Sequence, residues 1–281
     1  MGQPVGHSLS PVLHRAAYAA LGLPHTYDAI EVAAGEAGAM LDRLDGDWLG
    51  LSVTMPHKHD VLALADTADP LAQVVGAANT VLVTGSSGRR VLVAANTDVH
   101  GAAQALREAR SGAAPSAAPA RSAVVLGAGG TAAAALAALA ELGVTDPVVC
   151  VRSQARAAGL LQAAHRMGMD VTLRRFDAAA PLIADADLVV QTAVAGAADP
   201  IAADLTALLD GRPLRPGQTL LDAIYDPWPT ALAAAWSGAG GAVAPGWLML
   251  LHQAAEQVRL MTGSAAPVDA MRAALAGALE D

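Results

Sequence analysis

Short runs of apolar residues alternate with longer alanine-rich runs over most of this chain. The short runs have the length and composition of strands, whereas the longer runs favour helices. This alternation predicts an α/β protein in which parallel strands are joined by helices. Over the first third, the expected elements are helices at 11–21, 37–44, 61–68 and 100–109, and strands at 26–32, 50–53, 80–84 and 90–96.

The residues between the last two of these strands, Gly85, Ser86, Ser87 and Gly88, favour a tight turn and therefore a hairpin. Residues 111–119 contain only Ser, Gly, Ala and Pro, which is the composition of a loop or linker. The alternation then resumes. It predicts strands at 123–126, 147–151, 170–174, 187–192 and 219–224, and helices at 130–142, 154–167, 246–261 and 268–279.

Composition narrows the class of protein. The chain has 281 residues, 54% of them hydrophobic, and a net charge of -9, which is typical of a folded globular protein. The acidic balance argues against nucleic acid as a partner. A single cysteine, Cys150, forms no internal disulfide, and we expect a reducing cytoplasm. We expect no secretory signal, because Gly2, Gln3 and Pro4 follow the first residue without an apolar run. We expect no membrane span, because the apolar stretch at 123–142 is interrupted by glycines.

A glycine-rich motif follows one predicted strand and opens one predicted helix. It reads Gly127-Ala128-Gly129-Gly130-Thr131-Ala132. In this context the first glycine permits a tight turn, the second lets the backbone approach a pyrophosphate, and Ala132 allows close packing of helix on strand. The motif predicts a dinucleotide site, although a glycine turn without a ligand is the alternative.

The end of the next strand bears on which dinucleotide binds. It carries Arg152 and Ser153, with Arg156 close behind, and no Asp or Glu. An NAD enzyme usually has a carboxylate here for the ribose hydroxyls, whereas guanidinium groups suit a 2′-phosphate. We therefore expect NADP. The alternative is that both arginines are ordinary surface charges.

A second candidate site begins where the predicted strand at 50–53 reaches Pro56. This break places Thr54 and Lys58 in a loop at the end of a sheet, where open α/β sheets bind ligands. A lone lysine is most often a solvated surface charge. Lys58 becomes a candidate through polar residues elsewhere in the chain.

Those other residues lie at the ends of predicted elements. Ser8 and Ser10 precede a helix in which Ser10 and Pro11 suit the N-cap and N1 positions. Asn79 opens one hairpin strand and Asp98 follows its partner; we expect tertiary placement, rather than the hairpin pairing, to bring them together. On the helix at 246–261, Met249 and Gln253 share one face, and Gln253 needs a hydrogen-bond partner if it is buried.

Together these motifs resemble shikimate dehydrogenase over nearly the whole chain, and they look like those of actinobacterial members. The matching segments are Gly2 to His14, Val53 to Lys58, Gly76 to Thr80, Asn96 to Asp98, Gly127 to Ala132, Tyr225 to Thr230 and Gly246 to Ala254.

The resemblance implies two α/β domains. The first, at 1–99 and completed by the helices at 246–281, would bind substrate. The second, at 100–245 with the loop 111–120, would be a doubly wound NADP-binding Rossmann domain. The resemblance also implies a substrate cleft between the domains, no metal, and a monomer or homodimer.

The resemblance further implies reversible NADPH-dependent reduction of 3-dehydroshikimate to shikimate, with Lys58 and Asp98 as the catalytic pair. Lys58 suits a carbonyl that becomes an alkoxide, either as proton donor or as a stabilising charge. The implied substrate ligands are Ser8, Ser10, Thr54, Asn79, Gln253 and Tyr225. The implied cofactor residues are the glycine motif with Arg152, Ser153, Arg156, Gly246 and Met249.

Two departures from the family pattern stand out. Ser52 occupies a position where many members have asparagine, and the chain starts inside the first motif, so that a short first strand is expected to be missing and part of the sheet unpaired. The competing interpretations are an NAD-dependent quinate/shikimate dehydrogenase and a non-catalytic dinucleotide-binding protein.

Overall fold

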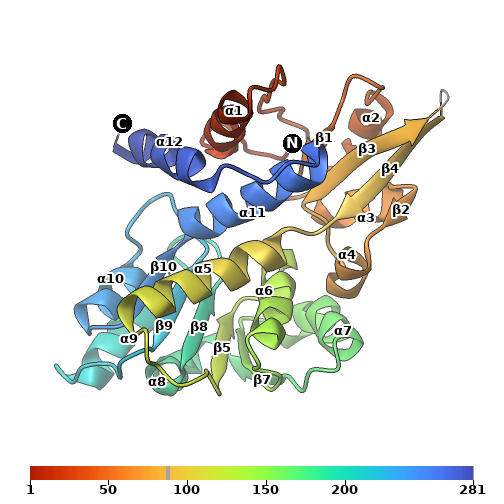
Figure 1. The fold of residues 1–281 in the computed structure, drawn as a ribbon. Coiled ribbons are helices and arrows are strands. Elements are labelled where there is room, and N and C mark those ends of the chain that lie inside the picture. Colours follow the sequence, from red (N-terminus) through yellow and green to blue (C-terminus); the bar gives the residue numbers. More distant parts are fainter. Residues whose placement is uncertain (87–88, 281) are drawn as a thin grey trace. The chain divides into compact units, whose positions relative to one another are not determined.

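A computed structural model describes residues 1–86 and 89–280, which form two compact units (Figure 1). The first unit contains residues Met1–Gly101 and Leu250–Asp281, and the second contains Ala102–Met249. Helices α5 (Asp98–Ala113) and α11 (Gly246–Thr262) contribute residues to both units.

The sheet of the first unit has the order β1-β3-β4-β2 and is mainly antiparallel. Only β2 and β4 pair in parallel, so the expectation of a parallel sheet is wrong for this unit. The predicted hairpin is confirmed by the pairing of β3 with β4, although turn residues 87–88 lie outside the described part. The four strands are β1 (Gly50–Ser52), β2 (Thr67–Ala68), β3 (Thr80–Ser86) and β4 (Arg89–Ala95).

The helix predicted at 61–68 is wrong in its position. Helix α3 begins at Lys58 and ends at Leu64, and the following residues form β2. A further helix, α4 (Pro70–Val75), begins where the Asp69 side chain accepts a hydrogen bond from the backbone of Ala72. An aspartate before a proline is a strong helix-start signal. The remaining helices of this unit are α1 (Ser10–Leu21), α2 (Ala37–Asp42) and α12 (Val268–Glu280).

The strand predicted at 26–32 is reduced to one bridge between Gly2 and Glu31. Val32 donates a backbone hydrogen bond to Gly2 on one side of the N-terminal segment. On its other side, Thr54 donates to the carbonyl of Met1, and the Met1 amine donates to the carbonyl of Ser52 at 2.5 Å. Residues 1–3 therefore pair along both edges, whereas residues 26–30 belong to no strand.

The second unit contains a six-stranded sheet in the order β10-β9-β8-β5-β6-β7, with every pair parallel. This is the doubly wound Rossmann topology, and its order reverses between β5 and β8, where such sheets bind ligands. The strands are β5 (Ala123–Leu126), β6 (Val148–Val151), β7 (Thr172–Arg175), β8 (Leu188–Gln191), β9 (Thr219–Asp222) and β10 (Ala242–Pro245).

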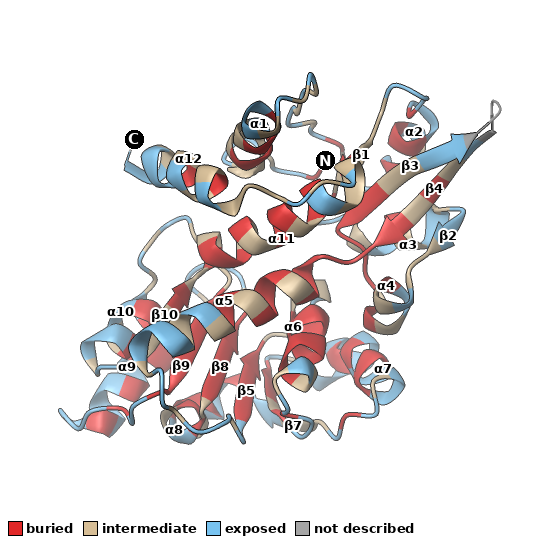
Figure 2. Ribbon diagram, in the orientation of Figure 1, coloured by how far each residue is buried: buried red, intermediate tan, exposed pale blue. Residues whose placement is uncertain are grey.

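Helices flank this sheet and bury its central strands. Strands β5, β8 and β9 are buried along their whole length, as Figure 2 shows. Sequence reasoning missed β10 and three helices, α8, α9 and α10; the alanine-rich α8 and α10 span only 7 and 8 residues, too few for a clear apolar period. The helices are α6 (Gly130–Glu141), α7 (Ala158–Arg166), α8 (Ala179–Asp185), α9 (Asp199–Leu209) and α10 (Ala231–Gly238), with 3-10 turns at Gln154–Ala157 and Phe176–Ala178.

The apolar stretch at 123–142 forms β5, a glycine turn and α6, as predicted. Within the described residues, we find no helix with both the length and the apolar character needed to cross a bilayer.

Candidate functional site

Lys58 is placed by the backbone at the end of β1. After this strand, Val53 donates a hydrogen bond to the carbonyl of Asn79, and the chain turns so that α3 begins at Lys58. The buried His57 ring contacts the carbonyl of Val32 at 2.8 Å, and the Lys58 carbonyl accepts from Ala78. The start of α3 is thus fastened to two neighbouring segments.

The Lys58 ammonium lies 2.5 Å from Oδ2 of Asp98, the first residue of α5. Their side chains are only 13% and 8% exposed, so this ion pair is screened far less than a surface pair. Lys58 is also the only lysine in the chain. In this pair the Lys58 ammonium donates a hydrogen bond, and the Asp98 carboxylate accepts it.

Asn79 connects this ion pair to the surrounding strands. Its Nδ2 donates to Oδ1 of Asp98 at 2.8 Å, and its Oδ1 accepts from the backbone N–H of Thr97 at 2.8 Å. Because a carboxylate only accepts and an N–H only donates, these partners fix the orientation of the amide. Asn79 is buried, so the orientation is held inside the protein.

The hairpin register itself brings Asn79 to Asp98. Thr80 pairs with Ala95, so the residue before β3 and the residues after β4 lie at the same end of the hairpin. The expectation that tertiary placement was needed is therefore wrong. In an antiparallel pair, the start of one strand is always beside the end of its partner.

Two glutamines on α11 complete the cluster. Gln253 accepts from Nδ2 of Asn79 at 3.0 Å, which provides the partner that its burial requires. Gln257, one turn later, donates to the carbonyl of Asn79 and to Oγ1 of Thr80, and it accepts from Oγ of Ser52 at 2.8 Å. Sequence reasoning missed Gln257. The signal was a second amide four residues after Gln253, on the same helix face.

The serines before α1 differ from their expected roles. Helix α1 begins at Ser10, its N-cap position is Leu9, and no side chain caps it, so the assignment of Ser10 as N-cap is wrong. Ser8 instead accepts a hydrogen bond from the backbone of Ser10 at 3.3 Å. A serine hydroxyl two residues earlier satisfies this backbone group, as in an ST turn.

Tyr27 and His14 lie beside these serines and beside Ser52. Their rings stack with centroids 4.1 Å apart. Burial raises the pKa of Tyr27 to about 12, and the hydroxyls of Ser52 and Ser10 act in the opposite direction. Burial lowers the pKa of His14 to about 4, against the opposing effects of the Ser10 carbonyl and the Gln257 side chain. His14 is therefore neutral at physiological pH.

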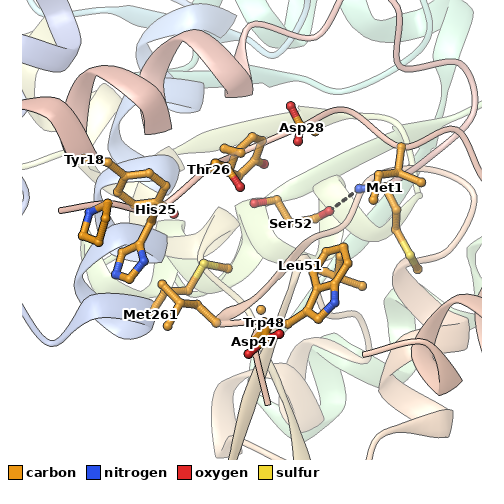
Figure 3. Close-up of a pocket in the computed structure, with 15 residues that line it drawn as sticks. Met1, Tyr18, His25, Thr26, Asp28, Asp47, Trp48, Leu51, Ser52 and Met261 are labelled. Atoms are coloured by element: carbon orange, nitrogen blue, oxygen red, sulfur yellow. Dashed lines mark hydrogen bonds between the residues drawn. The ribbon is translucent and has the colours of Figure 1, made fainter. Parts of the chain in front are cut away.

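A cavity of about 410 Å³ lies within the first unit (Figure 3). Its lining includes Met1, Trp48, Tyr27 and Ser52, between the segment 24–30 and β1. Lys58 and the residues that contact it do not line this cavity. Thr54, which was also predicted to bind substrate, is exposed in the turn after β1.

In the second unit, the glycine motif connects β5 to α6. Gly127 has φ 118°, and a Cβ there would lie 2.5 Å from Oγ1 of Thr192 at the end of β8. Gly129 precedes the helix with open space around it, whereas Ala132 is fully buried against its neighbours. The backbone at Gly129 and the N-terminus of α6 can therefore receive an anion at the switch point of the sheet. Thr192 is a neighbour of this motif that sequence reasoning missed.

Arg152 and Arg156, which follow β6, are exposed, whereas Ser153 is half-buried. Arg152 and Arg156 make no ion pair with any described residue, and Ser153 precedes a 3-10 turn without a side-chain cap. Both guanidinium groups are free to meet a phosphate.

The three remaining predicted residues belong to the second unit. Tyr225 lies in the loop after β9, where burial and then the charge of Asp226 raise its pKa. A Cβ on Gly246 would lie 2.6 Å from the carbonyl carbon of Ala223, so only glycine allows this approach at the start of α11. Met249 is buried on the same helix.

The doubly wound sheet with a glycine turn at its switch point defines a dinucleotide-binding α/β protein. A buried lysine–carboxylate pair in the other unit adds the residue types of an enzyme site. Comparisons with known proteins place this chain more narrowly. The shikimate dehydrogenase substrate binding domain matches residues 1–81, and the shikimate 5'-dehydrogenase C-terminal domain matches residues 246–276.

Whole-chain comparisons agree. The chain is 40% identical to the shikimate dehydrogenase (NADP(+)) of Rubrobacter xylanophilus, over 99% of this chain and 94% of that protein. It is 44% identical to the solved shikimate dehydrogenase of Mycobacterium tuberculosis, with a TM-score of 0.83 over 99% of this chain and 97% of that one. The quinate dehydrogenase of Corynebacterium glutamicum, solved with NAD, is 29% identical, with a TM-score of 0.82 over 98% and 96%. The chain belongs to the shikimate dehydrogenase family.

Proposed function

We propose that this chain catalyses the reversible NADPH-dependent reduction of 3-dehydroshikimate to shikimate, a step of aromatic amino acid (chorismate) biosynthesis. The observation that carries the proposal is the buried pair of Lys58 and Asp98, held by Asn79 and ringed by hydroxyl and amide groups. A small polyhydroxylated acid needs such a set of donors and acceptors. The family membership of the chain supports the same reaction.

The substrate would be held mainly by the first unit. Ser8 and Ser10 offer hydroxyl donors for a carboxylate, and Thr54, Asn79 and Gln253 offer groups that recognise hydroxyls. Tyr225 would add a phenol from the second unit. The first unit is thus proposed as the substrate domain and the second as the cofactor domain.

The second unit fits NADP. The open space at Gly129 and the unpaired N-terminus of α6 suit a pyrophosphate, and the free Arg152 and Arg156 suit a 2′-phosphate, with Ser153 as a further donor. Gly246 and Met249, at the start of α11, are proposed to line the nicotinamide side. When bound, NADPH supplies the hydride.

Lys58 would act where the carbonyl oxygen gains negative charge. Its ammonium can donate a proton to that oxygen or stabilise the charge, and both lower the barrier. Asp98 accepts a hydrogen bond from the ammonium through Oδ2 and one from Nδ2 of Asn79 through Oδ1, and each oxygen has a second lone pair. The carboxylate therefore orients Lys58 and remains an acceptor for a substrate hydroxyl.

One alternative has its own support. The similarity to the quinate dehydrogenase solved with NAD favours a quinate/shikimate dehydrogenase that uses NAD. The end of β6 argues against it, because it carries exposed arginines and has no Asp or Glu of the kind that usually binds the ribose hydroxyls. The third interpretation, a non-catalytic dinucleotide-binding protein, gives no reason for a buried lysine–carboxylate pair.

A grid of initial rates tests these alternatives. Oxidation of shikimate and of quinate is measured with NADP and with NAD, each to saturation. We expect the highest kcat/KM for shikimate with NADP. An equal or higher value with NAD would support the quinate/shikimate alternative, and cofactor binding without turnover would support the non-catalytic one.

The single lysine allows a direct test of the site. Reductive methylation modifies only Lys58 and the N-terminal amine, because the chain has no other lysine. Saturating shikimate is expected to slow methylation of Lys58, measured by peptide mass spectrometry, while the N-terminal amine is the internal control. Equal protection of both amines, or of neither, contradicts the placement of substrate at Lys58.

The cellular setting is also a proposal. The single buried cysteine and the biosynthetic role support a cytoplasmic enzyme. It would act on a small-molecule substrate, as a monomer or homodimer.

A further inference from the structure

We propose that Gln257 is a positioning residue of the reaction, which fixes the direction of a hydrogen-bond chain running from Ser52 to Asp98. This inference rests on the proposed function. It concerns a residue that contacts neither Lys58 nor Asp98 and acts on them through Thr80 and Asn79.

The orientation of the Gln257 amide follows from one backbone partner. Its Nε2 lies 3.1 Å from the carbonyl oxygen of Asn79, which can only accept. The other end of the amide, Oε1, therefore faces Oγ of Ser52 at 2.8 Å, and the Ser52 hydroxyl must donate to it.

The same argument fixes Thr80. Its Oγ1 accepts from Nε2 of Gln257 at 2.9 Å, so its one proton is directed to Oδ1 of Asn79 at 3.0 Å. Asn79 in turn donates from Nδ2 to Asp98. Every donor in this chain points toward the carboxylate, and aligned hydrogen bonds of this kind strengthen one another.

Gln257 is the point at which the direction is set. All its polar atoms are satisfied and only 1% of its surface is exposed, so the amide cannot turn without leaving buried groups unpaired. When the Nε2–H of Gln257 is removed, the Thr80 hydroxyl is free to rotate away from Asn79. Oδ1 of Asn79 would then keep only its hydrogen bonds from Thr97, and Asn79 would hold Asp98, and through it Lys58, less firmly.

Steady-state kinetics of Gln257→Leu test the inference. We expect kcat for shikimate oxidation to fall about tenfold, the effect of one lost hydrogen bond in the transition state, with the KM for NADP unchanged. Val258→Ala is the matched control, since Val258 is the next residue of α11 and its apolar side chain is fully buried. Val258→Ala is expected to lower the Tm about as much as Gln257→Leu does, without changing kcat.

A double-mutant cycle separates positioning from simple damage. Thr80→Val removes the hydroxyl that relays the effect, so Gln257→Leu combined with Thr80→Val should be no slower than Thr80→Val alone. Thr80→Ser keeps the hydroxyl and should keep kcat. If Gln257→Leu does not fold, the contrast between Thr80→Val and Thr80→Ser carries the test alone.

A wild-type kcat in Gln257→Leu, an equal loss in Val258→Ala, additive effects in the cycle, or equal kcat in the two Thr80 variants would each overturn the inference. Absence of shikimate turnover by the wild-type protein would instead overturn the proposed function.

Discussion

The two candidate sites of this protein are built in opposite ways. In the first unit, Lys58, Asp98 and Asn79 are held by buried side-chain hydrogen bonds and an ion pair. In the second unit, the glycine turn presents backbone, and Arg152 and Arg156 are exposed and free of ion pairs with described residues. The first site is fixed before a ligand arrives, whereas the second leaves its charges for the ligand to satisfy.

This difference matches what each site would bind. A small substrate that must present one carbonyl to a proton donor requires groups that are fixed in advance. A dinucleotide is large and highly charged, and backbone N–H groups with mobile guanidinium groups suffice to bind its phosphates. Substitutions in the first unit should therefore act mainly on kcat and on folding, and those in the second mainly on cofactor affinity.

The largest expected effect comes from Lys58→Ala. Removal of a general acid typically costs about 10²–10⁴ in rate, and the substitution also leaves Asp98 unpaired. We expect kcat to fall by that amount, while NADPH affinity, measured by fluorescence titration, is unchanged. A near-normal kcat would remove Lys58 from the mechanism, and a parallel loss of NADPH affinity would break the contrast between the units.

The next effect is a pH dependence of stability from His14. Because burial lowers its pKa from 6.5 to about 4, the unfolded state binds a proton at a higher pH than the folded state does. The stabilisation is therefore complete above pH 6.5 and is lost as the pH falls toward 4, by about 3 kcal/mol in total. Urea denaturation at a series of pH values measures it.

A non-titrating variant provides the control for this prediction. In His14→Gln, the fall in unfolding free energy between pH 6.5 and 4 should be smaller than in the wild type. Parallel pH profiles for the two proteins would show that His14 is not the responsible group.

Two glycines separate folding from cofactor binding in the second unit. Gly127→Ala forces an alanine into a positive φ and places its methyl group against Thr192. We expect this to cost about 1–3 kcal/mol of stability. Gly129→Ala meets open space at φ -85°, so its Tm should be unchanged while its methyl group weakens NADPH binding. Thermal unfolding and fluorescence titration measure the two effects. Normal NADPH affinity in Gly129→Ala would argue against a pyrophosphate at this turn.

The smallest expected effect is that of Arg152→Ala on cofactor choice. Loss of one exposed guanidinium should raise the KM for NADP about tenfold and leave the KM for NAD nearly constant. Arg212→Ala is the matched control, because Arg212 is an exposed arginine that lies just after α9. An equal rise in both KM values would assign Arg152 a general role in place of 2′-phosphate recognition.

Sequence patterns located the second unit better than the first. Strand β5 and the start of α6 were predicted at their observed positions, because a buried strand followed by a glycine turn has a strong local signature. Helices α8 to α10 were missed, since alanine fits helices without marking a buried face. In the first unit, the helix predicted at 61–68 failed because β2 depends on pairing with β4, a partner distant in the chain.

What the sequence by itself determined is the set of chemical groups: one lysine near a strand end, the glycine turn, and arginines in place of an acid after β6. Local chemistry and spacing are sufficient for these. Only the tertiary structure decided that Gln257 and Ser52 are hydrogen-bonded to each other, that Ser10 begins its helix without capping it, and that Asn79 donates to Asp98. Orientation and burial of polar groups depend on which distant segments share an interior, and no local pattern encodes them.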